Sequence, residues 1–342
     1  MIYRFFTGSY GTIGEDGIAA FTLDTERKTL TKTYGFSGIH HPSWILLNAA
    51  QTRLYAVQEQ IPEGKVHELS VQNGILTVEQ TFESGGADPC HLSLNQSETT
   101  LLCANYTSGS LAAFALDAAG HIERMSHFEQ YVGNSVNPVR QECPHIHFSR
   151  EYQGLCYVCD LGTDRVRILK VREDEVFTDT GAELVLPDGY GPRHLEFHEN
   201  HPELVYVLCE LASKLVIFEQ NGENYEIRQI LSCLPSDFHG ENTGSAIRHS
   251  GSLLFAANRG HDSIAVFEIL QDGSLRRTQM VQTGGRTPRD MIVLGDYLVI
   301  ANQDSDLLTV LKIGYEKKTL TDTGIRANTV RPTCICPIAE EI

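Results

Sequence analysis

Four ionisable side chains, far apart in the sequence, could act together on an anionic substrate. They are His145, Arg193, Glu210 and Arg259. Guanidinium groups bind phosphate or carboxylate in a bidentate manner and can stabilise a developing oxyanion. A histidine, whose ordinary pKa is near 6.5, can take a proton from water. These residue types therefore indicate hydrolysis of an anion, provided that the fold lets them face one ligand.

An eight-residue pattern that recurs seven times indicates how such residues are positioned. Each copy has an aliphatic residue at its third position and Phe or Leu at its sixth, as in GSLAAFAL and DSIAVFEI; an aliphatic residue also fills the eighth, except for Gln220 in one copy. A spacing of 44 to 55 residues between copies is typical of propeller blades. The third positions of the copies are Ile18, Val66, Leu111, Val166, Leu215, Ile264 and Leu308.

The segments around each copy predict three more strands per unit. A short apolar run such as RLYAVQE or YLVIANQ precedes each copy, and a polar stretch follows it. The first unit lacks an opening strand, and RPTCICPI at the C-terminal end, which starts at Pro332, can supply it. Upstream of the other six runs, a third segment opens at Pro42, Pro89, Pro144, Pro192, Ala246 or Pro288.

We therefore predict an all-β fold, a seven-bladed β-propeller with four-stranded antiparallel blades. The ring would be closed by pairing of the N- and C-terminal strands, which removes exposed sheet edges. Residues 1–342 are expected to form this single domain. A β-sandwich or a two-domain all-β protein would not explain seven copies at one period with a complementary strand left at the ends.

In a propeller, innermost strands begin on the face where second strands end, so residues at those places can meet. The strand starts are Trp44, His91, His145, Arg193 with His194, Arg248, and Arg289 with Asp290. The second-strand ends are Glu59, Tyr106, Asp160, Glu210, Arg259 and Gln303. The connections at 127–143 and 233–245 are long, and long loops often carry function. From these positions we expect His145, Arg193, Glu210 and Arg259 to be catalytic, and His91, Arg140, His147, Asp160 and His194 to bind substrate.

The net charge and the cysteine content limit the possible binding partners and the cellular compartment. The net charge of −17 argues against nucleic acid and anionic membrane surfaces, because both require basic patches. Nine cysteines, several inside apolar runs, are typical of free thiols in a reducing compartment, and no membrane span or signal peptide is apparent. We expect a cytoplasmic protein; nothing in the sequence sets its oligomeric state.

Recognised cofactor motifs do not occur in the sequence. C-x-x-C at Cys156–Cys159 falls in a predicted interior strand without a second pair, and the pair His145 and His147 lies outside any H-E-x-x-H motif. Neither G-x-S-x-G, G-x-G-x-x-G nor G-x-x-x-x-G-K-[ST] is present. We expect chemistry without a metal or an organic cofactor.

Several segments resemble the bacterial propeller-type 6-phosphogluconolactonases, which are related to fungal carboxy-cis,cis-muconate cyclases. They are SVNPVRQECPHIHFS, CDLGTDRVRIL, GPRHLEFHENHPELVYVLCEL and FHGENTGSAIRHSGSLLFAANRGHDSIAVFEI. The resemblance implies cofactor-free hydrolysis of 6-phosphoglucono-δ-lactone to 6-phosphogluconate in the pentose phosphate pathway. It places the family's active-site histidine at His145, its arginines at Arg193 and Arg259, and its glutamate at Glu210.

Two alternatives stay open at this point. Paired arginines bind two carboxylates as well as a phosphate, so the substrate could be another lactone or a muconate-like dicarboxylate. A non-enzymatic propeller could instead bind a protein partner, although the chain has one Trp and no recurring Trp-Asp at strand ends.

Overall fold

Seven four-stranded antiparallel sheets contain the strands of this computed structural model, which describes residues 1–171 and 177–339. The eight-residue pattern forms the third strand of each sheet counted from the innermost one, and the preceding apolar run forms the second. These seven sheets are the blades of a seven-bladed β-propeller with four strands each, as predicted.

Contacts divide the chain into two compact units. Unit 2 comprises Gly8–Ile18 and Tyr34–Gly191. Its elements form three complete sheets and one short 3₁₀ helix: β4 (Ile45–Leu47), β5 (Arg53–Gln58), β6 (Lys65–Gln72), β7 (Ile75–Glu83), β8 (Pro89–Leu94), β9 (Thr100–Asn105), β10 (Ser110–Leu116), β11 (Ile122–Gln130), β12 (Ile146–Tyr152), β13 (Leu155–Asp160), η1 (Leu161–Thr163), β14 (Arg165–Val171) and β15 (Phe177–Val185).

Unit 1 comprises Met1–Thr7, Ala19–Thr33 and Pro192–Ile342. It holds most of the first sheet and three complete ones: β1 (Ile2–Ser9), β2 (Ile18–Asp24), β3 (Thr29–Phe36), β16 (Pro192–His198), β17 (His201–Cys209), β18 (Lys214–Asn221), β19 (Asn224–Ser232), β20 (Thr243–Ser250), β21 (Leu253–Arg259), β22 (Ser263–Ile269), β23 (Leu275–Gln282), β24 (Pro288–Leu294), β25 (Tyr297–Asn302), η2 (Gln303–Ser305), β26 (Leu307–Gly314), β27 (Thr319–Asn328) and β28 (Pro332–Ile338). No helix in the described part of the chain combines the length and apolarity needed to cross a membrane.

Strand β10 shows why the repeated pattern is apolar on both faces. Side chains alternate across a strand, so Ala112 and Phe114 enter one hydrophobic cluster while Leu111 and Ala113 enter another. All seven residues of β10 are buried, whereas the next strand outward, β11, is largely exposed. Both faces of a middle strand are therefore buried. Its sequence is apolar throughout and lacks the apolar–polar alternation of a strand that has one exposed face.

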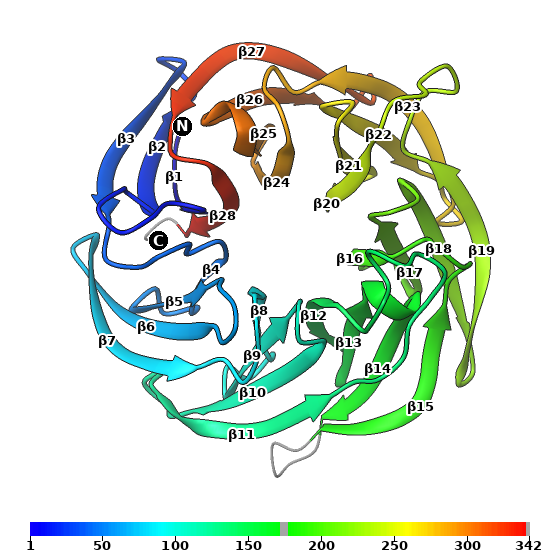
Figure 1. Ribbon diagram of the computed structural model, residues 1–342. Coiled ribbons are helices and arrows are strands. Elements are labelled where there is room, and N and C mark those ends of the chain that lie inside the picture. Colours follow the sequence, from blue (N-terminus) through cyan, green and yellow to red (C-terminus); the bar gives the residue numbers. More distant parts are fainter. Residues whose placement is uncertain (172–176, 340–342) are drawn as a thin grey trace. The chain divides into compact units, whose positions relative to one another are not determined.

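The ends of the chain share one sheet, as predicted. Its strand order is β28-β1-β2-β3, so the C-terminal strand occupies the innermost place and pairs with β1 (Figure 1). The pairing gives β1 a partner on both edges, which removes an exposed strand edge.

In the innermost strands β8, β12, β16 and β24 the second residue is a bulge. In β16 the register passes from Pro192 opposite Cys209 directly to His194 opposite Leu208, so Arg193 is the extra residue of a bulge. A bulge of this kind bends the strand and re-aims the extra side chain. The corresponding extra residues in β8, β12 and β24 are Cys90, His147 and Arg289. The bulge thus turns these side chains in a different direction from those of the adjacent residues in the strand.

Three predicted strand starts need correction. The strand expected to open at Pro42 is β4, which begins at Ile45, and the strand expected at Pro144 is β12, which begins at Ile146. The third difference, in the sixth unit, also changes the place of a candidate residue. We expected the innermost strand of the sixth unit to open at Ala246, which would put Arg248 at its beginning. The strand β20 begins at Thr243, so Arg248 lies well inside it and pairs with Asp290 at 2.8 Å. This strand lacks the opening proline that marks its equivalents, and a register shift between Gly244 and Ile247 displaces the pattern.

The cysteines inside apolar runs are buried, as the sequence indicated. Cys156 and Cys159 lie in β13 within the interior. Cys103, Cys156 and Cys233 are free thiols, and burial raises the pKa of each, that of Cys233 to about 12. They behave as small hydrophobic residues, because a buried thiol with a raised pKa is inert.

His67 on β6 gives a prediction about acid stability. It is 7% exposed, and its ring nitrogens lie 2.9 Å from Thr81 Oγ1 and 3.0 Å from Gln58 Oε1. Burial, reinforced by the charge of Lys65, lowers the pKa of His67 to about 4. Between this value and the ordinary pKa near 6.5 the unfolded chain binds more protons, so stability falls as pH drops through this window.

We therefore expect the substitution His67→Gln to remove part of the acid sensitivity. Between about pH 7 and pH 4, wild type should lose up to about 3 kcal/mol more free energy of unfolding than the variant. Urea denaturation at both pH values measures this difference. Equal losses in the two proteins would show that His67 is not the titrating group.

Candidate active site

Three of the four predicted catalytic residues form a buried cluster in unit 1. Arg193 is the bulge residue of β16, Glu210 directly follows β17, and Arg259 is the last residue of β21. The Nε atom of Arg193 lies 3.0 Å from Glu210 Oε2, and the Nη2 atom of Arg259 lies 2.8 Å from the same oxygen. Two neighbouring sheets thus bring two guanidinium groups onto one carboxylate.

Backbone at the start of β20 fixes the orientation of this cluster. The amide of Gly244 donates to the carbonyl of Glu210 at 2.9 Å, and Arg259 Nη2 donates to the carbonyl of Gly244 at 2.9 Å. Arg193 Nη1 donates to the carbonyl of Ser245. Each guanidinium therefore binds both a carboxylate and a backbone carbonyl, so both are held in place before a ligand arrives.

The charges of the cluster favour an anion. The side chains of Arg193, Glu210 and Arg259 are 3%, 4% and 14% exposed, and two positive groups with one negative group give the trio a formal charge of +1. Buried charge is costly unless it is paired. A phosphate, a carboxylate or a developing oxyanion is the chemical class that offsets this surplus, and Arg259 is the most exposed member.

Glu210 should be essential to the stability of this cluster. Replacing it with Gln leaves two buried guanidinium groups without their shared carboxylate, and we expect a loss of about 3–5 kcal/mol in the free energy of unfolding. Urea denaturation of Glu210→Gln measures it, with Glu210→Asp as the variant that keeps the charge and loses less. A loss below about 1 kcal/mol in Glu210→Gln would contradict the assigned pairing.

His145, the fourth predicted catalytic residue, lies in unit 2 directly before β12. Its ring stacks on that of Tyr106, with centroids 4.4 Å apart and 14° between the planes. The Nδ1 atom lies 3.0 Å from the backbone carbonyl oxygen of Tyr106. A carbonyl only accepts, so Nδ1 carries the hydrogen and Nε2 of the neutral ring keeps its lone pair. This is the tautomer in which Nε2 can take a proton.

Asp160, predicted to bind substrate, is placed to position His145. It ends β13 and is fully buried. Its Oδ1 accepts from the backbone amide of His145 at 2.9 Å, and its Oδ2 accepts from Arg167 Nη2 at 3.0 Å. The Arg167 guanidinium in turn lies 4.6 Å from the ring centroid of Tyr131. Both carboxylate oxygens thus have internal partners that fix the backbone entering β12.

Tyr106 brings together two further predicted substrate-binding residues. It directly follows β9, and its hydroxyl accepts from Arg140 Nη2 at 3.0 Å. The ring of His147 meets that of Tyr106 edge-on, with centroids 5.5 Å apart. The Nδ1 atom of His147 lies 3.9 Å from the thiol sulfur of Cys90. Tyr106 is one of the predicted strand-end residues, but its residue type alone indicates no role.

The remaining two predicted substrate-binding histidines have packed surroundings. The ring of His91 lies between those of Trp44 and Phe148, at centroid distances of 4.4 and 4.3 Å. In unit 1, His194 is 1% exposed, with Nε2 3.2 Å from Nη1 of Arg193. Because guanidinium only donates, this nitrogen accepts, so His194 helps to orient Arg193.

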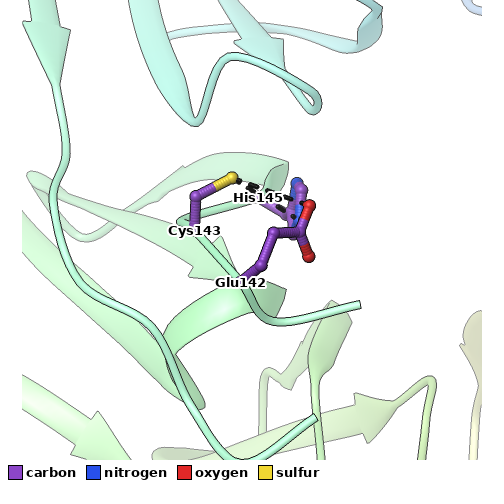
Figure 2. Close-up of side chains that lie close together, drawn as sticks. All are labelled: Glu142, Cys143 and His145. Atoms are coloured by element: carbon purple, nitrogen blue, oxygen red, sulfur yellow. Dashed lines mark hydrogen bonds and ion pairs between the residues drawn. The ribbon is translucent and has the colours of Figure 1, made fainter. Parts of the chain in front are cut away.

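The loop before His145 places two residues beside its ring that the sequence did not indicate as candidates. Glu142 Oε1 lies 3.4 Å, and Cys143 Sγ 3.9 Å, from the Nε2 of His145 (Figure 2). A backbone hydrogen bond and the side chain of His145 hold the pKa of the Glu142 carboxyl below its ordinary value. Burial and the charge of Glu142 raise the pKa of the Cys143 thiol. The spacing E-C-x-H matches no familiar motif, so only its place in the long connection could have indicated it.

Helix η1 anchors this loop by close approach. Gln141 Nε2 donates to the carbonyl of Leu161 at 2.9 Å, and the amide of Leu161 donates to the carbonyl of His145 at 2.9 Å. A Cβ atom at Gly162 would lie 1.9 Å from the carbonyl oxygen of Cys143. Glycine is therefore needed at this position for the loop to take its place.

Comparisons with known proteins agree with this fold. A family model described as "Lactonase, 7-bladed beta-propeller" matches residues 4–337. The 6-phosphogluconolactonase of Bacillus subtilis strain 168 is 33% identical over 97% of each chain. Among solved structures, a protein from Lactobacillus plantarum has a TM-score of 0.92 at 25% identity, covering 99% of this chain and 100% of its own. The periplasmic gluconolactonase of Pseudomonas aeruginosa has a TM-score of 0.92 at 23% identity and covers 99% of both chains, a likeness of fold.

Proposed function

This chain belongs to the lactonase family of seven-bladed β-propellers, and from that premise we propose that it hydrolyses 6-phosphoglucono-δ-lactone to 6-phosphogluconate. The relative from Bacillus subtilis, at 33% identity, carries the name of that activity. Membership of a lactonase family also favours an enzyme over a propeller that only binds a protein partner. The product would enter the pentose phosphate pathway.

The buried cluster of Arg193, Glu210 and Arg259 is the observation that carries this proposal. Its formal charge of +1 suits an anion, and its guanidinium groups are already oriented by Glu210 and by backbone carbonyls. In our proposal Arg193 and Arg259 bind the anionic group or the carbonyl oxygen of the lactone. Preorganised donors of this kind stabilise the charge that develops on the carbonyl oxygen.

The proposed reaction begins with His145. Its Nε2 takes a proton from water while the water oxygen forms a bond to the lactone carbonyl carbon, and the carbonyl π electrons move to the oxygen. The resulting oxyanion collapses and the bond to the ring oxygen breaks. The ring oxygen then receives the proton held on Nε2, which restores the neutral histidine and gives the open-chain acid. Glu142, at 3.4 Å from Nε2, stabilises the imidazolium formed in the first step.

The surrounding residues take supporting roles in this proposal. Arg140 and His147, both in contact with Tyr106, bind polar groups of the sugar. Asp160 holds the backbone of His145, and His194 orients Arg193. His91, packed between two aromatic rings, forms an apolar wall beside the bound sugar.

A substrate panel tests which anion is used. We expect 6-phosphoglucono-δ-lactone to be hydrolysed with a higher kcat/KM than glucono-δ-lactone, by at least ~10-fold, because each good charged hydrogen bond contributes about 1.5–3 kcal/mol. Paired arginines also suit two carboxylates, so a lactone of a muconate-like dicarboxylate belongs in the panel. Faster turnover of that compound, or equal turnover with and without phosphate, would overturn the phosphosugar assignment.

We further propose that the reaction needs no metal or organic cofactor and takes place in the cytoplasm. Support for the location comes from the fully buried free thiols of Cys103, Cys156 and Cys233, which suit a reducing compartment.

A further inference from the structure

We propose that Glu142, Cys143 and His145 form a binding site for a divalent cation of the zinc class, with one coordination position left open. The three side chains come from one loop and turn their ligand atoms toward a common point (Figure 2). Their ligand atoms all lie within 4.8 Å of one another. Within the described residues, no other group of three or more potential ligands lies this close together.

The spacing of the three atoms is close to that of a tetrahedral site. His145 Nε2 and Glu142 Oε1 are 3.4 Å apart, and Cys143 Sγ lies 3.9 Å from each of them. Zinc–ligand bonds near 2.0–2.3 Å at tetrahedral angles place ligand atoms roughly 3.3–3.6 Å from one another. Small side-chain rotations would therefore bring all three atoms to bonding distance of one ion.

The tautomer and the ring orientation of His145 also support the site. Metal-binding histidines commonly donate their other ring N–H to a backbone carbonyl or a carboxylate, which fixes the tautomer and the ring plane. The Nδ1 atom of His145 lies 3.0 Å from the Tyr106 carbonyl, and stacking on Tyr106 fixes the ring. Nε2 therefore lies toward the thiol and the carboxylate, and in the neutral ring its lone pair is available to a metal ion. The Glu142 side chain is 50% exposed, so an ion can enter from solvent.

The ligand set selects the metal. A thiolate, an imidazole and a carboxylate together suit Zn²⁺ and its spectroscopic substitute Co²⁺, whereas Mg²⁺ and Ca²⁺ prefer oxygen ligands. Binding releases the thiol proton of Cys143 as the metal–sulfur bond forms. Among the described residues, neither Cys90 with His147 nor His127 with Glu129 belongs to a group of three such ligands.

One consequence of this site rests on the proposed function. A metal bound at His145 takes the lone pair of Nε2, which hydrolysis needs for the proton of water. Zn²⁺ is therefore an inhibitor of the lactonase rather than its cofactor.

Metal binding is tested on the whole chain without reference to activity. Titration calorimetry with Zn²⁺ should give one site per chain, and Co²⁺ should give a near-ultraviolet thiolate-to-metal charge-transfer band. Cys143→Ser should lose the band, and Cys143→Ser, Glu142→Gln and His145→Ala should each bind Zn²⁺ at least ~10-fold more weakly. The matched control Glu129→Gln should bind like wild type, with circular dichroism showing that every variant is folded.

The activity arm separates this inference from the proposed function. Zn²⁺ should inhibit lactone hydrolysis by wild type, and in Cys143→Ser at least ~10-fold more Zn²⁺ should be needed for the same fractional inhibition. A thiolate-to-metal band in a protein that does not hydrolyse the lactone would support the metal site and contradict the proposed function. No band, or equal Zn²⁺ affinity in wild type and the three ligand variants, would overturn the site whatever the activity.

Discussion

Replacing His145 with Ala should lower kcat for lactone hydrolysis by about 10²- to 10⁴-fold, the usual contribution of a positioned general base. The reason is that Nε2 holds the lone pair, because Nδ1 carries its hydrogen toward the carbonyl of Tyr106. The KM should change little, since the anionic group is assigned to the arginines. Initial-rate kinetics at saturating substrate measure the effect.

The matched control for this prediction is His127→Ala. His127 also lies beside a carboxylate, at 3.8 Å from Glu129, but we assign it no role. It should keep the wild-type kcat. A His145→Ala enzyme that is folded and retains more than half of the wild-type kcat would remove His145 from the reaction.

Replacing Arg259 with Ala should lower kcat/KM by at least ~10²-fold, which is the cost of removing one donor that stabilises an oxyanion. Arg259 is the most exposed member of its cluster and bonds both Glu210 and the carbonyl of Gly244, so its guanidinium is held ready for a ligand. Arg259→Lys should recover only part of the loss, because an ammonium cannot reproduce the planar fork of donors.

A surface arginine provides the comparison for that result. Arg276 pairs with Glu268 on an exposed part of β23, and its side chain is 67% exposed. Arg276→Ala should leave kcat/KM within about two-fold of wild type, because exposed ion pairs contribute little. If Arg259→Ala behaves in the same way, the cluster does not act on the substrate.

The fold could be predicted from the sequence because every blade contains a middle strand that is buried on both faces. A middle strand such as β10 must be apolar on both faces, and this requirement recurs at one period. The leftover strand beginning at Pro332 could likewise be matched to the incomplete first unit. Both inferences rest on local patterns that reflect burial directly.

The details that aim the side chains could not be predicted in this way. The bulge that releases Arg193 from its ladder depends on a change of register between two strands, which no single segment encodes. The same kind of shift in β20 placed Arg248 away from the expected strand start and put Ser245 beside Arg193. Register is a property of strand pairs, so single-strand patterns miss it.

Residues that act through irregular backbone were also missed. Glu142 and Cys143 reach His145 because their loop is tied to η1, where only glycine at position 162 allows the approach. Tyr106 binds the ring of His145 by stacking and its Nδ1 by a backbone carbonyl, a contact that the residue type alone does not indicate. Such contacts depend on loop conformation and not on periodicity.

The most direct test of the proposed function is the rate of 6-phosphoglucono-δ-lactone hydrolysis, with the lactone generated in situ and spontaneous ring opening subtracted. Wild type and His145→Ala are compared at equal concentration after circular dichroism shows that both are folded. We predict a wild-type rate that rises in proportion to enzyme concentration, well above the spontaneous rate, and a rate at least ~10²-fold lower for His145→Ala. Folded wild type that adds nothing to the spontaneous rate would contradict the assignment of this substrate.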